Sequence, residues 1–369
     1  MRIFLSALAM AAMLGASALA AEKPDAATGA VRPEPKLVLV TFDGVRWEDV
    51  FRGADPKLAA DAKFVEPDIL SDWVKPAWLD PANRREALMP FVHGVVAKDG
   101  VVLGDRDVGE CAHVANDMWF SYPGYNELLT GRPDPRILEN DDIPNPNVTF
   151  LEFLNRRPDF QGRVEAVGTW TLFPNIINSK RSGVPVNAEL GGRYPTDVQT
   201  ARFALEAVEK HKPRVLYVAF GDTDELAHAG DYDQYLSAIE RGDAFLRLLW
   251  DRLQADPFYR DQTTLIVTTD HGRGHEPLGA WRDHSAVRYH QLNPDYQPEY
   301  NKTGVIGSDN VWFAAMGPAV VRSGAADYRG KTCAESRQVA ASALQALGED
   351  WRAFDKGAGA PFAFIAKTR

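Results

Sequence analysis

The chain has 369 residues, of which 45% are hydrophobic and 25% are charged, and its formal net charge is −10 at pH 7. This composition is typical of a globular protein with a large core. The acidic balance argues against a nucleic-acid-binding surface, which needs a basic patch. The acidic balance does not exclude an anionic substrate, because metal ions reverse the sign of the local charge at a site built from carboxylates.

The first twenty residues have the layout of a secretory signal peptide. Arg2 is followed by an apolar run rich in Ala, Leu and Met, and residues 18–20 (ALA) form a small-x-small cleavage site. The alternative is a membrane anchor, but a spanning helix needs about 20 apolar residues and this run is shorter. We therefore expect cleavage after Ala20, a periplasmic or secreted location, and a soluble mature chain without a membrane span.

Residues 21–35 are rich in Ala, Pro, Glu and Lys and have no apolar period, which predicts a flexible leader. A single folded domain is expected over residues 36–369. Four apolar, β-branched runs predict buried strands: residues 36–42 (KLVLVTF), 214–220 (RVLYVAF), 264–269 (TLIVTT) and 311–316 (VWFAAM).

Acidic or His residues follow three of these four strands directly. Asp43 follows the first strand, Asp224 lies just after the second, and Asp270 and His271 follow the third. Ligands of open parallel sheets bind at the edge where the strands end. The fourth strand ends in Gly-Pro without a catalytic side chain and is expected only to pair and pack.

Three segments with the apolar period of a helix alternate with the strands: residues 197–212, 235–253 and 335–347. The alternation predicts an α/β fold, a three-layer αβα sandwich with a mostly parallel central sheet. Residues 52–100, rich in Pro, Trp and charge, and residues 274–308, polar and aromatic, depart from this rhythm. Long insertions at sheet edges commonly shape pockets, so either is a candidate cap.

A metal site is indicated by the Asp and His residues at the predicted sheet edge. Asp224 and His228 are four apart and share one face of a helix, although such a pair alone is more often a solvated surface pair. Asp270 and His271 both reach one ion only if the backbone turns, which Gly272 permits. The alternative is that these residues only form polar turns at the ends of the strands. Their presence after three separate strands would then be three independent coincidences.

A later histidine is needed to complete a site with Asp224 and His228. His284 is close enough in sequence, and His275 competes for this role. Mixed Asp and His ligands without sulfur suit zinc, whereas all-oxygen sites suit calcium or magnesium. Cys111 and Cys333 are the only cysteines, too few for a cysteine-zinc module. The sequence leaves open whether they form a disulfide.

Ser121 is the candidate nucleophile. Pro123-Gly124 fits a tight turn into a helix, which places the hydroxyl near backbone N–H groups that favour anionic oxygens. The alternative is a serine that caps this helix. The chain has no Gly-x-Ser-x-Gly elbow, which disfavours a Ser-His-Asp hydrolase, whereas a nearby divalent ion would activate the hydroxyl without a His base.

Taken in order, these residues resemble the alkaline phosphatase superfamily. The resemblance runs over roughly residues 37–318 and rests on Asp43, on Ser121 ahead of a Leu-Leu-Thr-Gly stretch, on Asp224-x3-His228, on Asp270-His271-Gly272 and on a later His. It implies one zinc ion held by Asp224, His228 and His284, and a second held by Asp43, Asp270, His271 and the Ser121 oxygen. It favours His284 over His275, because the third His of these enzymes sits in a small turn after the Asp-His pair.

The resemblance implies an exported two-zinc phosphohydrolase that cleaves small-molecule phosphate esters through a phosphoserine, with monoester or diester open. Asn140 is the nearest match to the Asn that binds a phosphate oxygen in phosphodiesterase-like members. Sulfatase activity is disfavoured, because Tyr125 stands where sulfatases carry Arg. A phosphoglycerate-mutase-like phosphotransferase and a non-catalytic binding protein could share this fold. Export argues against the mutase and the full ligand set against the binding protein, and the oligomeric state is not indicated.

Overall fold

The computed structural model describes residues 34–188 and 196–368. Within these ranges the chain from Glu34 onward forms one compact unit. The predicted signal peptide and most of the predicted leader lie outside the described residues. None of the helices in the described ranges combines the length and the apolar character that a bilayer crossing requires.

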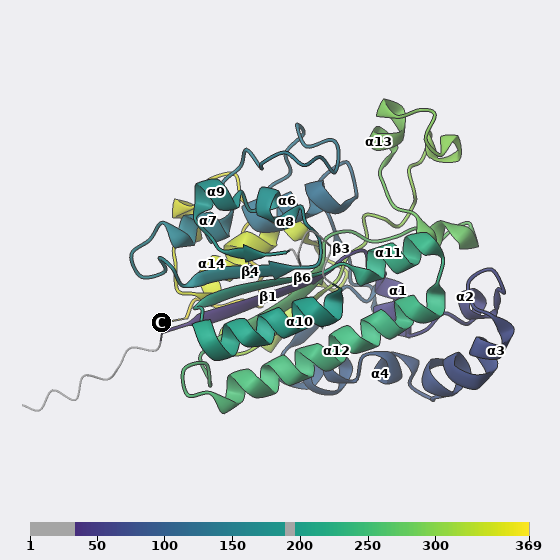
Figure 1. Cartoon of the computed structure of the whole chain (residues 1–369), viewed down its shortest axis with the longest axis horizontal. Coiled ribbons are helices and arrows are strands. Elements are labelled where there is room, and N and C mark those ends of the chain that lie inside the picture. The colour runs from purple at the N-terminus through teal and green to yellow at the C-terminus, as the bar shows by residue number, and fades with distance from the viewer. Residues whose placement is uncertain (1–33, 189–195, 369) are drawn as a thin grey trace, which may run out of the picture. The chain divides into compact units, whose positions relative to one another are not determined.

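A seven-stranded sheet lies at the centre of this unit, in the order β2-β8-β7-β1-β6-β4-β5 (Figure 1). The strands are β1 (Lys36–Phe42), β2 (Val101–Leu103), β4 (Val164–Gly168), β5 (Val186–Asn187), β6 (Val215–Phe220), β7 (Thr263–Thr269) and β8 (Phe313–Met316). All four predicted strands are present, and β8 alone among them runs antiparallel to its neighbours β7 and β2.

The register of the central strands brings their carboxyl ends to the same edge of the sheet, which we call the carboxyl edge. β1 is parallel to both β6 and β7, and Phe42 pairs with Phe220 on one side and with Thr269 on the other. The residues that follow these three positions therefore leave the sheet at the same level. This is the edge at which the sequence predicted Asp43, Asp224 and Asp270 to meet.

Helices cover both faces of the sheet and complete a three-layer αβα sandwich, as predicted. One face carries α6 (Ser121–Thr130), α7 (Phe150–Asn155), α8 (Phe173–Ile176) and α14 (Val339–Ala346), and the other carries α10 (Asp197–Glu206) and α12 (Tyr232–Ala255) (Figure 1). Leu37 and Leu39 belong to the first core and Val38 and Val40 to the second. Because both faces are buried, β1 is apolar along almost its whole length.

The predicted helices are present with different bounds. The helix predicted over residues 197–212 is α10 followed by a π-helical turn, Ala207–His211, and α12 extends beyond the predicted 235–253 at both ends. The prediction of a helix from residue 335 was wrong at its start. Glu335 instead pairs with His113, because Ala334–Glu335 (β9) forms a small parallel sheet with Ala112–His113 (β3).

The two candidate caps have different structures. Residues 52–100 form a chain of short helices: α2 (Pro56–Ala60), α3 (Pro67–Ile69), the π-helix Leu70–Leu79, α4 (Arg84–Leu88), the π-helix Val92–Val96 and α5 (Ala97–Asp99), after α1 (Trp47–Arg52). Their side chains Val74, Trp78 and Phe91 are fully buried in the same core as α12. This insertion therefore forms part of the core.

Residues 274–308 carry α13 (Val287–Leu292) and two 3-10 turns, Leu278–Arg282 and Pro298–Tyr300. This insertion lies beside the carboxyl edge of the sheet and supplies part of the site described below. The remaining elements are α9 (Ser179–Ser182), α11 (Asp222–Ala229) and the 3-10 turns Arg106–Val108, Arg322–Tyr328, Ser336–Gln338 and Trp351–Ala353.

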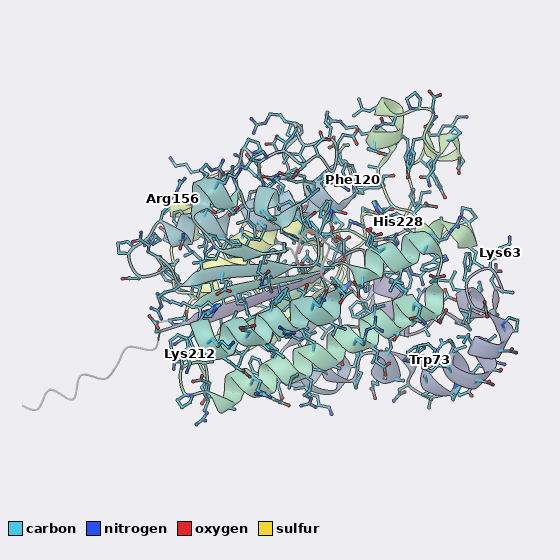
Figure 2. The ribbon with its side chains drawn as sticks, in the orientation of Figure 1. Lys63, Trp73, Phe120, Arg156, Lys212 and His228 are labelled. Atoms are coloured by element: carbon cyan, nitrogen blue, oxygen red, sulfur yellow. A yellow bond between two sulfur atoms is a disulfide. The ribbon has the colours of Figure 1, made fainter. Side chains whose placement is uncertain are left out.

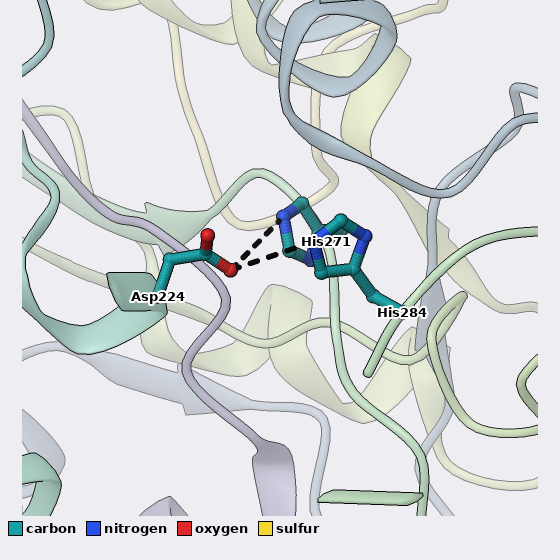
Figure 3. Close-up of side chains that lie close together, drawn as sticks. All are labelled: Asp224, His271 and His284. Carbon is teal, nitrogen blue, oxygen red and sulfur yellow. Dashed lines mark ion pairs between the residues drawn. The ribbon is translucent and has the colours of Figure 1, made fainter. Parts of the chain in front are cut away.

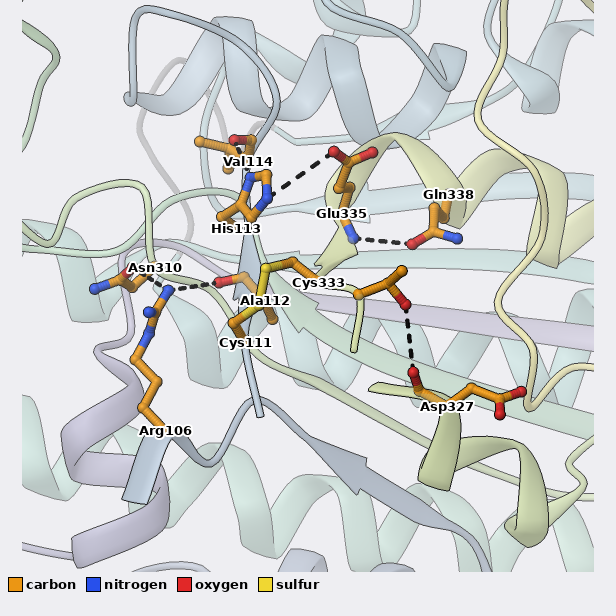
Figure 4. Close-up of a disulfide and its surroundings, with 11 residues drawn as sticks. Arg106, Cys111, Ala112, His113, Val114, Asn310, Asp327, Cys333, Glu335 and Gln338 are labelled. Carbon is orange, nitrogen blue, oxygen red and sulfur yellow. Dashed lines mark hydrogen bonds and ion pairs between the residues drawn. A yellow bond between two sulfur atoms is a disulfide. The ribbon is translucent and has the colours of Figure 1, made fainter. Parts of the chain in front are cut away.

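Cys111 and Cys333 form a disulfide across a separation of 222 residues, with their Cα atoms 4.8 Å apart (Figure 4). The bridge lies directly before β3 and β9, where the Ala334 N–H donates to the Cys111 carbonyl at 2.9 Å. It settles the pairing that the sequence left open. It also anchors the chain segment that leads from β3 to Ser121.

Candidate active site

The sheet topology brings the predicted ligands to one edge. Asp43 follows β1, Asp270 and His271 follow β7, and α11, which follows β6, carries Asp224 and His228. Ser121 is the first residue of α6. In Figure 2, His228 and Phe120, the residue before Ser121, lie near the ends of the central strands, and both line one cavity.

Asp43, Asp270 and His271 form a buried cluster, which we call the deep group. Their exposed fractions are 5%, 0% and 0%, and their ligand atoms all lie within 4.8 Å of one another. His271 Nε2 is 3.2 Å from Asp43 Oδ1 and 3.5 Å from Asp270 Oδ2. Ser121 Oγ lies 3.4 Å from the same Nε2. The candidate nucleophile is therefore next to the deep group.

One oxygen of each deep carboxylate is paired and the other is not. Asp43 Oδ2 accepts from the Tyr125 hydroxyl at 2.9 Å, and Asp270 Oδ1 accepts from the Gly44 N–H at 3.1 Å. Asp43 Oδ1 and Asp270 Oδ2 are buried and make no hydrogen bond of ordinary geometry among the described residues, and a charged neighbour of both is His271 Nε2. Buried carboxylate oxygens without a donor are costly unless a cation satisfies them. The deep group therefore fits a metal ion.

The orientation of the His271 ring agrees with a ligand role. Its Nδ1 donates to the Gly272 carbonyl at 2.8 Å, which leaves Nε2 facing the two unpaired oxygens. Burial lowers the pKa of His271, but the carboxylates of Asp270 and Asp43 outweigh burial and raise it to about 9. Burial, together with the neighbouring carboxylates, raises the pKa of both Asp43 and Asp270. The deep group thus holds excess negative charge that a cation would neutralise.

Asp224, His228 and His284 form a second cluster, which we call the open group. His228 Nε2 is 3.0 Å from His284 Nε2 and 3.3 Å from Asp224 Oδ2, and His284 Nε2 is 3.6 Å from Asp224 Oδ1. Two ligand atoms of a tetrahedral site with zinc–nitrogen distances of about 2.0–2.1 Å lie about 3.3 Å apart. The open group therefore has spacings close to those of a tetrahedral metal site.

The two groups are continuous. His271 Nε2 lies 3.9 Å and His284 Nε2 lies 3.6 Å from Asp224 Oδ1, so the Asp224 carboxylate lies beside both histidines (Figure 3). Burial and the neighbouring His271 hold the pKa of His284 well below its usual value. His284 is therefore neutral, which is the form that binds a metal.

The structure separates the two candidates for the third histidine. His284 lies beside Asp224 and His228, whereas His275 lines a different cleft with Arg46 and Glu48. Asn140 lies next to the start of α6, where its Oδ1 accepts from the Tyr122 N–H at 2.9 Å.

Ser121 does not cap its helix. Phe120 occupies the cap position, and Ser121 is the first helical residue. The hydroxyl is therefore not used as a cap and is available at the helix N-terminus.

Two residues of this site, Tyr125 and Arg273, were not predicted from the sequence. The Tyr125 side chain is fully buried and its hydroxyl donates to Asp43; its position four residues after Ser121, on the same face of α6, was a usable signal. The Arg273 side chain is also buried and contacts Asp224 Oδ1. No sequence signal separated this arginine from a solvated loop residue.

Two cavities open on either side of Ser121. The larger, about 370 Å³, extends along Trp170 and Asp222. The smaller, about 290 Å³, lies over the open group and is walled by Phe120, Tyr289 and Tyr296. Ser121, Asn140 and Asp224 line both cavities.

Comparison with known proteins agrees with the predicted fold. A family model described as Metalloenzyme superfamily matches residues 183–286, a range that contains Asp224, His228, Asp270, His271 and His284. The lipoteichoic acid synthase LtaP from Listeria monocytogenes is similar in structure, with a TM-score of 0.51, 10% identity and coverage of 92% of this chain and 77% of that chain. A putative sulfatase from Bacteroides thetaiotaomicron has a TM-score of 0.50, 11% identity and coverage of 85% and 71%.

The chain has the fold of the alkaline phosphatase superfamily. A protein of this superfamily from Vibrio parahaemolyticus also matches, with a TM-score of 0.45, 12% identity and coverage of 86% of this chain and 67% of that chain. No curated protein matches the sequence. The α/β fold that the resemblance implied is confirmed.

Proposed function

We propose that this protein is a two-zinc phosphohydrolase that cleaves phosphate esters with Ser121 as the nucleophile. The observation that carries the proposal is the position of Ser121 Oγ, 3.4 Å from His271 Nε2 at the first residue of α6. A serine hydroxyl beside a metal-binding cluster and at a helix N-terminus is suited to attack an anionic phosphoryl group.

Each group of ligands has a distinct task in this proposal. One zinc ion would be held by Asp43, Asp270, His271 and the Ser121 oxygen, and the second by Asp224, His228 and His284. The ions would activate the Ser121 hydroxyl and neutralise charge on the reacting oxygens. Tyr125 orients Asp43 through its 2.9 Å hydrogen bond. The Gly272 carbonyl fixes the tautomer of His271. These contacts hold the deep group rigid around the nucleophile.

The direction of the reaction follows from the positions of the two groups. Ser121 contacts the deep group, and in-line displacement places the departing oxygen on the opposite side of the phosphorus, toward the open group. The cavity of about 290 Å³ over His228 and His284 would receive the leaving group. Water would then hydrolyse the phosphoserine from that side.

The disulfide supports a periplasmic or secreted location as part of the proposal. Disulfides persist in oxidising compartments and are rare in the cytosol. Cys111 and Cys333 are bonded to each other, and the part of the chain that the structure describes holds no free cysteine. This observation is independent of the predicted signal peptide.

The proposal is tested by hydrolysis of para-nitrophenyl phosphate, its bis-ester and para-nitrophenyl sulfate, with and without a chelator. We expect chelator-sensitive turnover of a phosphate ester, restored by zinc, and a loss of at least about 10³-fold in kcat for Ser121→Ala. Ser182→Ala is the matched control, because Ser182 is also 5% exposed but lies in α9. Turnover of the sulfate alone, or full activity of Ser121→Ala, would contradict the proposal.

A further inference from the structure

Arg273 is a buried cation inside the site, and its guanidinium is held from three directions. Its exposed fraction is 1%. Nε donates to the Trp281 carbonyl at 2.9 Å, Nη2 donates to the Arg282 carbonyl at 2.8 Å, and Nη1 donates to Asp224 Oδ1. Burying a charge is costly unless its donors are satisfied. These three contacts therefore fix Arg273 in one orientation.

The contacts of Arg273 join the two elements that supply the open group. Asp224 comes from α11, whereas the carbonyls of Trp281 and Arg282 belong to the segment that ends at His284. The guanidinium is thus a direct link between the carboxylate and the loop that carries its partner histidine.

Gly44 leaves the space that this contact needs. A Cβ added to Gly44 would lie 2.6 Å from Arg273 Nη1 and 2.9 Å from Asp224 Oδ1. The backbone of Gly44 also has φ +61°, a conformation that favours glycine. The glycine after β1 is therefore matched to the pair formed by Arg273 and Asp224.

We propose that Arg273 is the positioning residue of the open group. Its guanidinium occupies Oδ1 of Asp224 and directs Oδ2 toward His228. The 3.3 Å between Asp224 Oδ2 and His228 Nε2 is the geometry that results. With Oδ1 held by the guanidinium, Asp224 presents Oδ2 to a metal ion beside His228. The guanidinium also ties the loop that carries His284 to the same carboxylate. This inference rests on the proposed zinc chemistry of the open group but not on turnover.

Zinc affinity measures this role directly. Hydrogen-bond partners of metal ligands typically contribute about 10–100-fold to metal affinity. We therefore expect Arg273→Met to weaken one of two zinc sites by about 10–100-fold and to leave the other unchanged. Arg273→Lys keeps the charge but cannot donate to three acceptors in one plane, so it should recover only part of the loss.

The experiment is a zinc titration of the purified protein in competition with a chromogenic chelator, with total zinc determined by elemental analysis. Arg46→Met is the matched control. Arg46 is 3% exposed and pairs with the buried Asp49 at 2.8 Å, but it contacts none of the proposed ligands. This control should lower the melting temperature and retain two zinc sites of unchanged affinity.

The outcomes separate the inference from the proposed function. Suppose that the wild-type protein binds two zinc ions and that folded Arg273→Met binds both with the wild-type affinities. That result would overturn the positioning role but not the proposed function. A wild-type protein that binds no zinc would overturn both. If Arg273→Met does not fold, Arg273→Lys gives the same test, because it keeps the buried charge while losing the planar contacts of the guanidinium. Selective loss of one site supports the inference, and retention of both sites overturns it.

Discussion

The deep and open groups differ in how the protein holds them. Asp43, Asp270 and His271 are 0–5% exposed and follow two adjacent strands of the sheet. In the open group the His228 side chain is 40% exposed, and Asp224 and His284 are 14% and 11% exposed. Its ligands come from a helix and an insertion loop. The deep group is therefore positioned by the sheet itself, whereas the open group depends on side-chain contacts.

This difference matches the two tasks in the proposed reaction. The deep group surrounds the nucleophile, where rigidity and exclusion of water favour attack. The open group faces a cavity, where the leaving group must enter and depart. We therefore expect substitutions in the deep group to have larger effects than substitutions in the open group.

Asp270→Asn is expected to have the largest effect. Asp270 Oδ2 is buried without a partner among the described residues, and a neutral amide at this position removes the charge that would bind a cation. We expect the zinc content to fall from two ions to one and kcat/KM for the phosphate ester to fall by at least about 10³-fold. Elemental analysis and steady-state kinetics measure both quantities.

Asp243→Asn is the control for this variant. Asp243 is equally buried but lies in α12, where it accepts from the N–H groups of Phe91 and Val92. Its substitution should change stability and leave zinc content unchanged. Two retained zinc ions in Asp270→Asn, with more than a tenth of the wild-type turnover, would remove the distinction between the groups.

His228→Ala should have a smaller and reversible effect. His228 is the most exposed proposed ligand, so water can replace its imidazole. We expect a loss of about 10–100-fold in kcat/KM, largely restored by excess zinc. His275→Ala is the control, since His275 lines another cleft. A greater loss for His275→Ala than for His284→Ala would reverse our choice between the histidines of the 274–308 insertion.

The deep group could be predicted from the sequence because local signals decide it. The run from Lys36 to Phe42 ends where β1 ends, and parallel strands bring their carboxyl ends together. Arg273 could not be predicted, because its burial depends on carbonyls eight and nine residues away that face it only in the folded loop. Its neighbours in sequence give no sign of this.

The core role of residues 52–100 was also not visible in the sequence. Helical turns there are short, and a π-helix with Pro76 inside it interrupts the usual apolar period. Trp78 and Phe91 nevertheless become buried, because they meet α12 from a distant part of the chain. The start of the predicted helix at Glu335 failed for a similar reason, since its pairing with His113 depends on a segment more than 200 residues earlier.

The smallest expected difference between the groups is in the protons that zinc displaces. The raised pKa of His271, about 9, means that the metal-free protein keeps this imidazole protonated at neutral pH. Zinc needs the neutral form, so filling the deep group should release about one proton from His271 at neutral pH, and the raised pKa values of Asp43 and Asp270 can only add to this release. The low pKa of His284 means that zinc in the open group displaces none from this side chain. The zinc affinity of the deep group should therefore rise by up to about tenfold per pH unit below about pH 9.

Titration calorimetry in two buffers of different ionisation enthalpy measures this release. The wild-type protein should release at least about one more proton per chain than Asp270→Asn, in which only the open group binds zinc. The sign follows from the direction of the pKa: a histidine whose pKa is raised loses its proton only above that value, so zinc competes with it throughout the neutral range. Equal release from both proteins would mean that His271 is already neutral without metal. The carboxylates of the deep group would then be balanced by something other than its histidine.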